Sequence, residues 1–283
     1  MARYQATLAG IVGVEGRGLH SGRTVAVRLL PAPAGHGRVF RRVDLPEPVP
    51  IPARVSSVVD SRRATTLGVD GQRVSTVEHL LAALAAAHID NVLVEVDGPE
   101  VPALDGSAAL WLSALDAAGR SVQQARCCPV VVDAPVLVSQ GSRRACLLPA
   151  PRMSWDVRVN FDHPLLHDRR HRGTLTPAGF RRHLAWARTF VFRSEVDALR
   201  AAGLGQGGDL DVVVVLDGDG VLNPGGLRHP DEPLRHKVVD LLGDLALLDA
   251  PLEARAEVYL PGHALHVALL HALLARRTRV ERG

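Results

Sequence analysis

The order of expected elements repeats once along the chain, and this repeat restricts the fold more than any other sequence feature. A helix, a strand and a second helix close each half, over about residues 75–119 and 232–277. Short strand patterns cluster before each of these units, which argues against an alternating doubly wound sheet. We therefore predict an α+β fold of two similar domains, each a β-sheet with a paired-helix layer.

The domain boundary is expected in the segment "QQARCCPVVVDAP". A chain of 283 residues is long enough for two domains with separate cores. We predict an N-terminal α+β domain over residues 1–126 and a C-terminal α+β domain over residues 127–283.

Composition excludes several classes of protein. A hydrophobic content of 47% and a charged content of 22% are typical of a soluble globular protein. The net charge is only +3, and the Arg clusters "DRRHRG" and "ARRTRVERG" are short, which favours solvated surface over a nucleic-acid partner. No apolar run reaches membrane-spanning length and the start lacks a signal-peptide pattern. The three cysteines form no disulfide framework, so we expect a cytoplasmic protein.

One helix carries an unusual polar edge. In "LRHKVVDLLGDLALL", residues 234–248, His236, Asp240 and Asp244 recur every four residues among apolar positions. At about 100° per residue they fall within about 80° of arc, and Lys237 lies about 20° beyond them. An imidazole, two carboxylates and an ammonium are thus predicted along one edge of this helix.

The spacing of His236 and Asp240 suits a zinc site, although other interpretations remain open. Imidazole and carboxylate one turn apart can bind the same ion, and catalytic zinc takes three protein ligands. His79 in "STVEHLLAA" could supply the third, with the adjacent Glu78 acting on a water molecule. Alternatively, Ser75 would cap this helix in a capping box with Glu78, and His236 and Asp240 would form a surface pair.

Other histidines offer weaker candidates. His163, His167 and His171 are four residues apart in "DHPLLHDRRHRG", but Pro164 and the Arg-rich sequence favour a loop. We expect them to be exposed loop histidines rather than a second metal site. His263 begins a helix in "PGHALH", where a single histidine is usually structural.

Several long segments, in order from about residue 8 to 277, resemble one known family. They are "GLHSG", "FRRVDL", "VSTVEHLLAALAAAHIDNVLVEVDGPEVPALDGSA", "FDHP", "ARTF", "LNPGGLRHPDEPLRHKVVDLLGDLALL" and "PGHAL". The chain resembles the UDP-3-O-acyl-N-acetylglucosamine deacetylases, the zinc amidases at the committed step of lipid A biosynthesis.

The resemblance implies a zinc-dependent amide hydrolase and a role for each site residue. It implies that His79, His236 and Asp240 bind zinc and that Glu78 is the general base. It implies that His263 is a charged imidazole, oriented by the carboxylate of Asp244, which stabilises the oxyanion and protonates the leaving amine. Thr189 would donate to the oxyanion, and Lys237, Phe161 and Phe190 would contact the nucleotide sugar.

The resemblance also implies an arrangement of the domains. The two helix layers would pack against each other with the site between them, and each domain would carry a small insert. The second insert, about residues 190–216, would form an apolar passage for the acyl chain. The implied partner is a UDP-linked acylated N-acetylglucosamine, and we expect a monomer.

The chain departs from the family pattern at a few positions. Val191 stands where Gly is usual, which could alter the mouth of the passage. Leu260 and Pro261 replace a basic and a small residue, which puts one nucleotide contact in doubt. His266 stands in place of an Asn, a change we expect to be structural. Two rival hypotheses remain. The first is a zinc amidase that acts on a different acylated sugar. The second is a non-enzymatic protein with a structural zinc, but structural sites are closed by four protein ligands and only three are expected here.

Overall fold

The computed structural model describes residues 3–280 and contains two sheets with the same strand order. The first consists of β2 (Val12–Arg17), β3 (Thr24–Pro31), β9 (Val92–Val96), β4 (Arg38–Arg42) and β5 (Pro50–Pro52), in that spatial order. The second consists of β12 (Val136–Gln140), β13 (Arg143–Pro149), β19 (Leu252–Tyr259), β14 (Ser154–Val159) and β15 (Arg169–Thr174), and β11 (Val130–Val131) adds to β19.

The pairing directions repeat as well. In the first sheet β4 runs parallel to β9, with Phe40 opposite Val94, and the other neighbours are antiparallel. In the second sheet β14 runs parallel to β19, with Val157 opposite Val258. The prediction of two similar α+β halves is confirmed.

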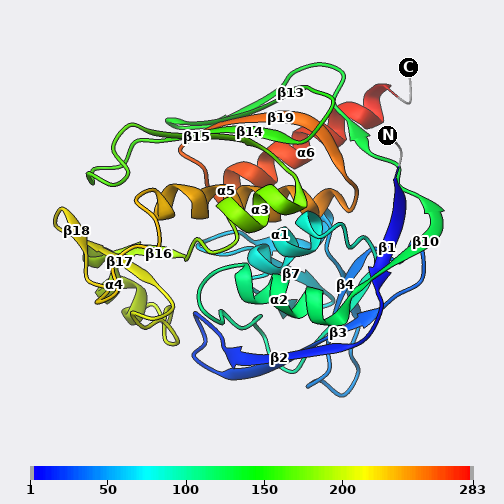
Figure 1. The fold of residues 1–283 in the computed structure, drawn as a ribbon, viewed down its shortest axis with the longest axis horizontal. Helices are drawn as coiled ribbons and strands as arrows, with labels where there is room; N and C mark the ends of the chain where they lie inside the picture. The colour runs from blue at the N-terminus through cyan, green and yellow to red at the C-terminus, as the bar shows by residue number, and fades with distance from the viewer. Residues whose placement is uncertain (1–2, 281–283) are drawn as a thin grey trace.

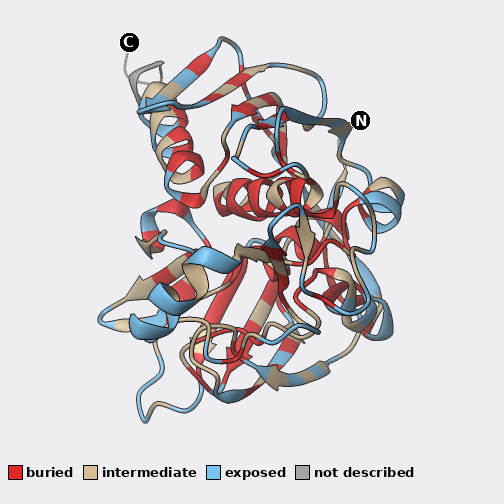
Figure 2. Cartoon of the chain, turned by 90° about the vertical axis from the view of Figure 1, so that its left-hand side faces the viewer, coloured by how far each residue is buried: buried red, intermediate tan, exposed pale blue. Residues whose placement is uncertain are grey.

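Two helices flank the central strand of each sheet in sequence. The first half contributes α1 (Glu78–Ala86) and α2 (Ala109–Ala118), and the second contributes α5 (Glu232–Leu245) and α6 (His263–Val280). Figure 1 shows the resulting layers, sheet, helices, helices and sheet, with the helices in the middle. Figure 2 shows buried residues both in these helices and on the strands. α1 packs directly against α5, which confirms the expected helix-to-helix packing.

The helix layers meet most closely where α1 crosses α5. A Cβ added at Gly243 of α5 would lie only 2.1 Å from the carbonyl oxygen of Glu78. No side chain fits at that separation, so glycine allows the two backbones to touch. Around this crossing the apolar side chains of both helices belong to one core cluster with those of the sheets. β19 contributes every second side chain to this core, and its buried residues therefore alternate with half-buried ones.

Each half also carries a small three-stranded insert. The first is β6 (Val58–Asp60), β7 (Thr66–Val69) and β8 (Gln72–Val74). The second is β16 (Phe190–Phe192), β17 (Val214–Asp217) and β18 (Gly220–Val221), with α4 (Arg193–Ala201) between its first two strands. It extends slightly past the expected residue 216, because β17 continues into a hairpin with β18.

The remaining elements connect the layers. They are β1 (Tyr4–Leu8), which pairs with β10 (Arg120–Arg126), α3 (Pro177–His183), and the short 3-10 helices η1 (Val55–Ser57) and η2 (Ala246–Leu248). β10 is the last strand before β11 begins the second sheet, and the boundary after residue 126 stays a prediction. None of the described helices is long and apolar enough to cross a membrane.

Candidate active site

Three potential metal ligands converge beside the crossing of α1 and α5. Nε2 of His79 lies 3.4 Å from Oδ1 of Asp240, and Nε2 of His236 lies 3.3 Å from the same oxygen. One ligand atom from each residue falls within 4.8 Å of the others. His236 and Asp240 are only 5% and 1% exposed, so the interpretation as a surface helix pair is wrong.

The chemistry of this donor set fits a zinc ion. Burial lowers the pKa of His236 well below its usual value, which keeps the imidazole in the neutral form that binds metal. Burial opposes ionisation of Asp240, but its electrostatic interactions with His236 and Lys237 and its hydrogen bond with His79 hold its pKa well below the usual range. Two imidazoles and one carboxylate are a known ligand set of hydrolytic zinc sites, which leave a further position open.

Glu78 faces this group and does not cap its own helix. α1 begins at Glu78 without a side-chain cap, the Ser75 hydroxyl donates to the carbonyl of Pro99, and Thr76 has a φ of +59°. The alternative of a cap at Ser75 in a capping box with Glu78 is therefore wrong. The carboxylate of Glu78 instead accepts a hydrogen bond from the backbone N–H of Thr65 at 3.1 Å. Burial raises the pKa of Glu78, which makes its carboxylate a stronger base.

An acid–base group occupies the other end of the α5 edge. Nδ1 of His263 lies 2.8 Å from Oδ2 of Asp244, and the Thr65 hydroxyl donates to Oδ1 of Asp244 at 2.6 Å. Burial disfavours a charged imidazole, but the carboxylate of Asp244 raises the pKa of His263 to about 10. His263 is therefore a cation at neutral pH, and its Nε2 lies 3.9 Å from Oε1 of Glu78.

Two residues of this group were missed by the sequence analysis. Thr65 lies on the segment before β7, and nothing in its spacing links it to Asp244. His266 lies one helical turn after His263, and its Nδ1 lies 2.7 Å from Oδ2 of Asp244. The i, i+3 spacing of the two histidines was the only signal for His266.

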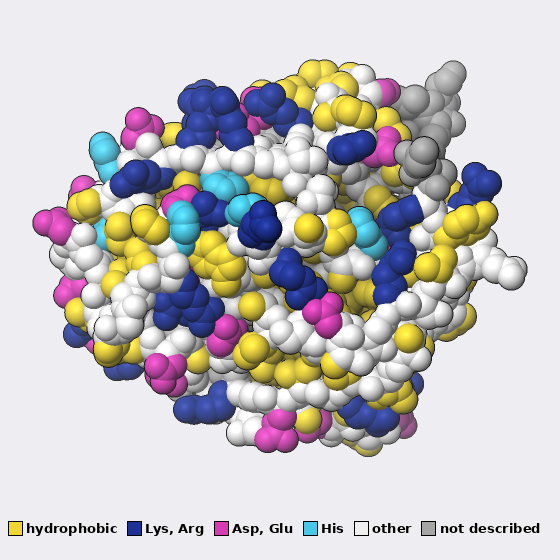
Figure 3. Space-filling view, in the orientation of Figure 1, with side chains coloured by type: hydrophobic (Ala, Val, Ile, Leu, Met, Phe, Trp, Pro, Cys, Tyr) yellow, Lys and Arg dark blue, Asp and Glu magenta, His cyan; other side chains and the backbone are white. Residues whose placement is uncertain are grey.

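A pocket of about 870 Å³ opens over both groups. It brings together all the residues expected to contact substrate. Figure 3, in the orientation of Figure 1, shows histidines and Lys or Arg side chains interspersed with apolar ones over one face of the molecule. Besides the metal group, Glu78 and His263, its lining includes Phe161, Thr189, Phe190, Lys237, Arg62, Arg63 and Arg143.

Aromatic and cationic side chains pack directly on the metal group. Nζ of Lys237 lies 2.7 Å from Oδ2 of Asp240 and 5.4 Å from the centre of the Phe190 ring. Phe190 in turn packs edge-on against the His236 ring at 5.7 Å. Lys237 is the single lysine of the chain, and the structure places it beside a predicted metal ligand.

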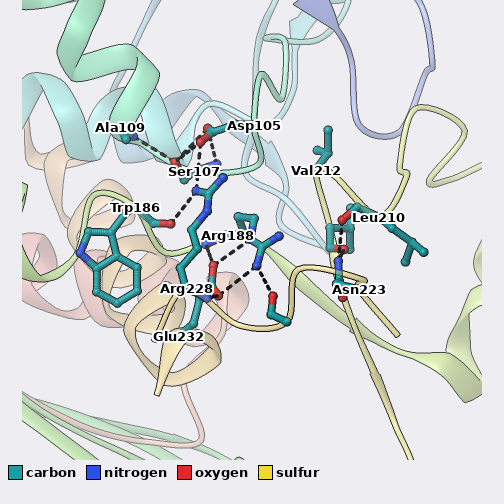
Figure 4. Close-up of polar contacts among 12 residues, drawn as sticks. Asp105, Ser107, Ala109, Trp186, Arg188, Leu210, Val212, Asn223, Arg228 and Glu232 are labelled. Atoms are coloured by element: carbon teal, nitrogen blue, oxygen red, sulfur yellow. Dashed lines mark hydrogen bonds and ion pairs between the residues drawn. The ribbon is translucent and has the colours of Figure 1, made fainter. Parts of the chain in front are cut away.

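A buried ion pair holds the segment that carries Thr189. Nε of Arg188 donates to Glu232 at 2.9 Å, and its Nη2 donates to the carbonyl of Gly226 at 2.9 Å (Figure 4). The backbone N–H of Thr189 donates to Gly106 of the first half at 2.9 Å. The segment is thus tied to the start of α5 and to the other domain.

A second cavity, of about 180 Å³, adjoins the first within the second insert. It lies between α4, β16 and β17, and most of its lining is apolar. The lining includes Leu19, Val191, Val196, Leu199, Leu204, Val213 and Val215.

The other histidine set forms no metal group within the described residues. His167 is exposed as expected, but His163 is buried and accepts a hydrogen bond from the backbone N–H of Leu165. His171 lies on β15 and accepts a hydrogen bond from Nε1 of Trp155 at 2.9 Å. The expectation of exposed loop histidines is therefore wrong for His163 and His171, because the sheet and its loop pack over them.

Two histidines and a carboxylate, flanked by a buried glutamate and a charged histidine, define a metal-dependent hydrolase. Comparison with known proteins agrees with this class. Residues 5–275 match the family model described as UDP-3-O-acyl N-acetylglycosamine deacetylase, and the chain belongs to this family.

Curated relatives carry the same description. The chain is 46% identical over 271 residues to the UDP-3-O-acyl-N-acetylglucosamine deacetylase of Anaeromyxobacter sp. (strain Fw109-5), covering 96% of this chain and 88% of the relative. It is 44% identical to the protein of that name from Myxococcus xanthus (strain DK1622), covering 96% and 86%. For Thermosynechococcus vestitus (strain NIES-2133 / IAM M-273 / BP-1), the identity is 43% and the coverage 98% and 96%.

Proposed function

We propose that the chain deacetylates UDP-3-O-acyl-N-acetylglucosamine with a zinc ion held by His79, His236 and Asp240. As a member of its family it hydrolyses the N-acetyl amide and releases acetate, at the committed step of lipid A biosynthesis. The observation that carries the proposal is the placement of Glu78 and His263, 3.9 Å apart, in the lining of one pocket that His79, His236 and Asp240 also line. When bound, zinc lowers the pKa of a water ligand to about 7 and polarises the amide carbonyl.

Glu78 and His263 divide the proton transfers between them. Glu78 accepts a proton from the water whose oxygen attacks the carbonyl carbon. His263, positively charged because of Asp244, stabilises the oxygen that gains negative charge and then donates its Nε2 proton to the nitrogen. The C–N bond breaks, acetate forms, and the sugar is left with a free amine.

The other lining residues orient the substrate in this proposal. Thr189 offers a hydroxyl to the developing oxyanion, and Phe161 and Phe190 offer apolar contacts to the nucleotide sugar. Lys237 and Arg143 supply cations for its diphosphate, and Arg143 lies against the loop that carries Leu260 and Pro261. The apolar cavity of the second insert accommodates the acyl chain.

One alternative substrate is favoured by particular residues. Val191 lines the acyl cavity and Leu260 carries no charge toward the nucleotide, so a differently acylated sugar is the second candidate. A structural zinc fits poorly, because the metal group lines an open pocket and structural sites are closed.

We also propose a cytoplasmic location and a monomeric state. A nucleotide-linked substrate and three free cysteines support the location. The monomer and the lack of a nucleic-acid partner stay predictions.

The direct test is incubation of the purified, zinc-loaded protein with 3-O-acylated UDP-N-acetylglucosamine. We expect acetate and free amine in equal amounts, and loss of both after chelation and their return with zinc. Parallel assays with other acylated N-acetylated sugars test the alternative. Acetate release from one of those sugars, but not from the UDP-linked one, would contradict the proposed substrate.

A further inference from the structure

The carboxylate of Asp244 contacts three donors, and the proposed mechanism uses only one of the two imidazoles. Nδ1 of His263 and Nδ1 of His266 lie 2.8 Å and 2.7 Å from the same oxygen, Oδ2. The Thr65 hydroxyl donates a hydrogen bond to the other oxygen, Oδ1, at 2.6 Å. Asp244 and His266 are both 0% exposed, so water does not compete for these contacts.

The carboxylate of Asp244 defines the direction of its hydrogen bond with His266. These donors hold the pKa of Asp244 well below its usual value in spite of burial, so its carboxylate is ionised and can only accept. Nδ1 of His266 must therefore carry the hydrogen. Nε2 of His266 is buried without a hydrogen-bond partner among the described residues. Among the described residues, the side chain of His266 therefore makes one hydrogen bond, which it donates to Asp244.

We propose that His266 is a positioning residue that acts on His263 through Asp244. Its hydrogen bond fixes the rotation of the carboxylate so that Oδ2 faces Nδ1 of His263. It also takes a share of the negative charge that would otherwise act on His263 alone. This inference rests on the proposed roles of His263 and Asp244 in the deacetylation.

The charge balance around His263 gives the direction of the effect. The groups around it are Thr65, Glu78 of α1, Asp240 and Asp244 of α5, His266 of its own helix, and the more distant imidazoles of His20 and His236. Removing the donor at position 266 leaves the charge of Asp244 less compensated. His263 then becomes more basic and less well oriented, which makes it a poorer proton donor.

A pair of variants of equal shape separates this role from packing. The amide of His266→Asn places a donor as many bonds from Cα as Nδ1, whereas His266→Leu has nearly the same outline and no donor. We expect His266→Leu to lower kcat by about 10- to 100-fold, the weight of one hydrogen bond to a buried charge. KM should stay within about twofold, since the residue does not touch substrate. The alkaline limb of the kcat/KM profile should move to higher pH.

His266→Asn should recover most of kcat and return the alkaline limb to its original position. Zinc content is measured in each variant and should stay unchanged. Where the Leu variant does not fold, His266→Gln takes its place, because its longer side chain keeps an amide but cannot place the donor at the position of Nδ1. Equal kcat and equal pH profiles in the Asn variant and the donor-deficient variant would overturn the proposal.

Proton NMR of the resting protein, with histidines labelled with ¹⁵N, supplies a readout independent of turnover. The parent should show two strongly downfield imidazole N–H signals, one from each histidine on Asp244. The donor-deficient variant should keep only that of His263, at a changed position. If the parent shows a single such signal, the role of His266 is wrong. If both signals are present but the substrate is not deacetylated, the proposed function is wrong instead.

Discussion

The two ends of the polar edge on α5 use the same residue types for different purposes. At the metal end, two imidazole nitrogens lie 3.3 and 3.4 Å from one carboxylate oxygen of Asp240. At the acid–base end, the carboxylate of Asp244 lies 2.6 to 2.8 Å from three hydrogen-bond donors. The first group is arranged to receive a cation, whereas the second already satisfies its charge with protein groups.

The histidines at the two ends shift in opposite directions. Both His236 and His263 are buried, which by itself lowers the pKa of an imidazole. Near His236 the carboxylate of Asp240 also pairs with Lys237, and the effect of burial is larger than that of Asp240, so the pKa of His236 falls. Near His263, no Lys or Arg side chain of the described residues pairs with the carboxylate of Asp244, and the pKa of His263 rises to about 10. A neutral imidazole on α5 and a charged imidazole on α6 thus lie at the two ends of one polar edge, because different elements pack against each end.

The largest effect is expected when the metal end is broken. His236→Ala removes a ligand that burial keeps neutral, so most of the zinc should be lost, and activity with it. Metal analysis of the purified variant measures this directly. His263→Ala, at the other end, should lose activity but keep its zinc, and His167→Ala, on the exposed loop, should keep both. Full zinc occupancy in His236→Ala would show that the ligand assignment is wrong.

The next largest effect concerns the base that stands between the two ends. Glu78→Gln keeps the shape of the side chain and its acceptor for Thr65, but it cannot take a proton. We expect kcat/KM to fall by about 10²–10⁴, the usual weight of general acid–base catalysis, with zinc retained.

The pH profile of the parent provides the matching control for Glu78. Because Glu78 must be ionised and its pKa is raised by burial, the rate should fall as pH drops through that raised value. The rate should also fall on the alkaline side as His263 loses its proton. The Gln variant should lack the acidic limb, and a near-normal rate in that variant would remove Glu78 from the mechanism.

A smaller effect is expected from the cation beside the metal end. Lys237→Arg replaces a compact ammonium, packed between Asp240 and Phe190, with a wide planar guanidinium. We predict a loss of at least about tenfold in kcat/KM for the UDP-linked substrate, about 1.4 kcal/mol, with unchanged zinc content. Arg126→Lys, at the far end of β10, should leave kcat/KM as it is. If Lys237→Arg matches the parent, the contact to the nucleotide sugar should be abandoned.

The smallest effect tests a histidine outside both ends. Burial lowers the pKa of His171 to about 4. The imidazole of His171 is therefore protonated at a lower pH in the folded chain than in the unfolded chain. The unfolded state binds more protons between about pH 6.5 and 4, and stability therefore falls as pH drops through this window. After allowance for partial exposure, the contribution is about 1–2 kcal/mol.

His171→Gln keeps an acceptor for Trp155 but does not titrate in this range. Denaturant unfolding at several pH values should show a shallower loss of stability in this variant than in the parent. Zinc content and activity at neutral pH should be unchanged. An identical pH dependence of stability in the two proteins would mean that His171 titrates normally.

Much of the fold could be predicted from the sequence because its signals are local. The repeated order of elements and the polar edge of residues 234–248 follow from the period of apolar side chains, which the geometry of a helix or strand imposes. The same spacing left His236 and Asp240 equally compatible with a surface pair, and it gave Glu78 a plausible but wrong role in a capping box. The assignment of roles depended on long family-like segments.

Only the tertiary structure decided what meets the two ends of that edge. Gly243 lets α1 approach α5 closely enough to bring Glu78 and His79 to Asp240. Thr65, from a segment with no distinguishing pattern, and His266, expected to be a structural change, both bind Asp244. The sequence determines which side chains share a helix face, because that depends on neighbours in the chain. Burial, charge compensation and the partners of each carboxylate depend on the packing of distant segments, which local spacing does not encode.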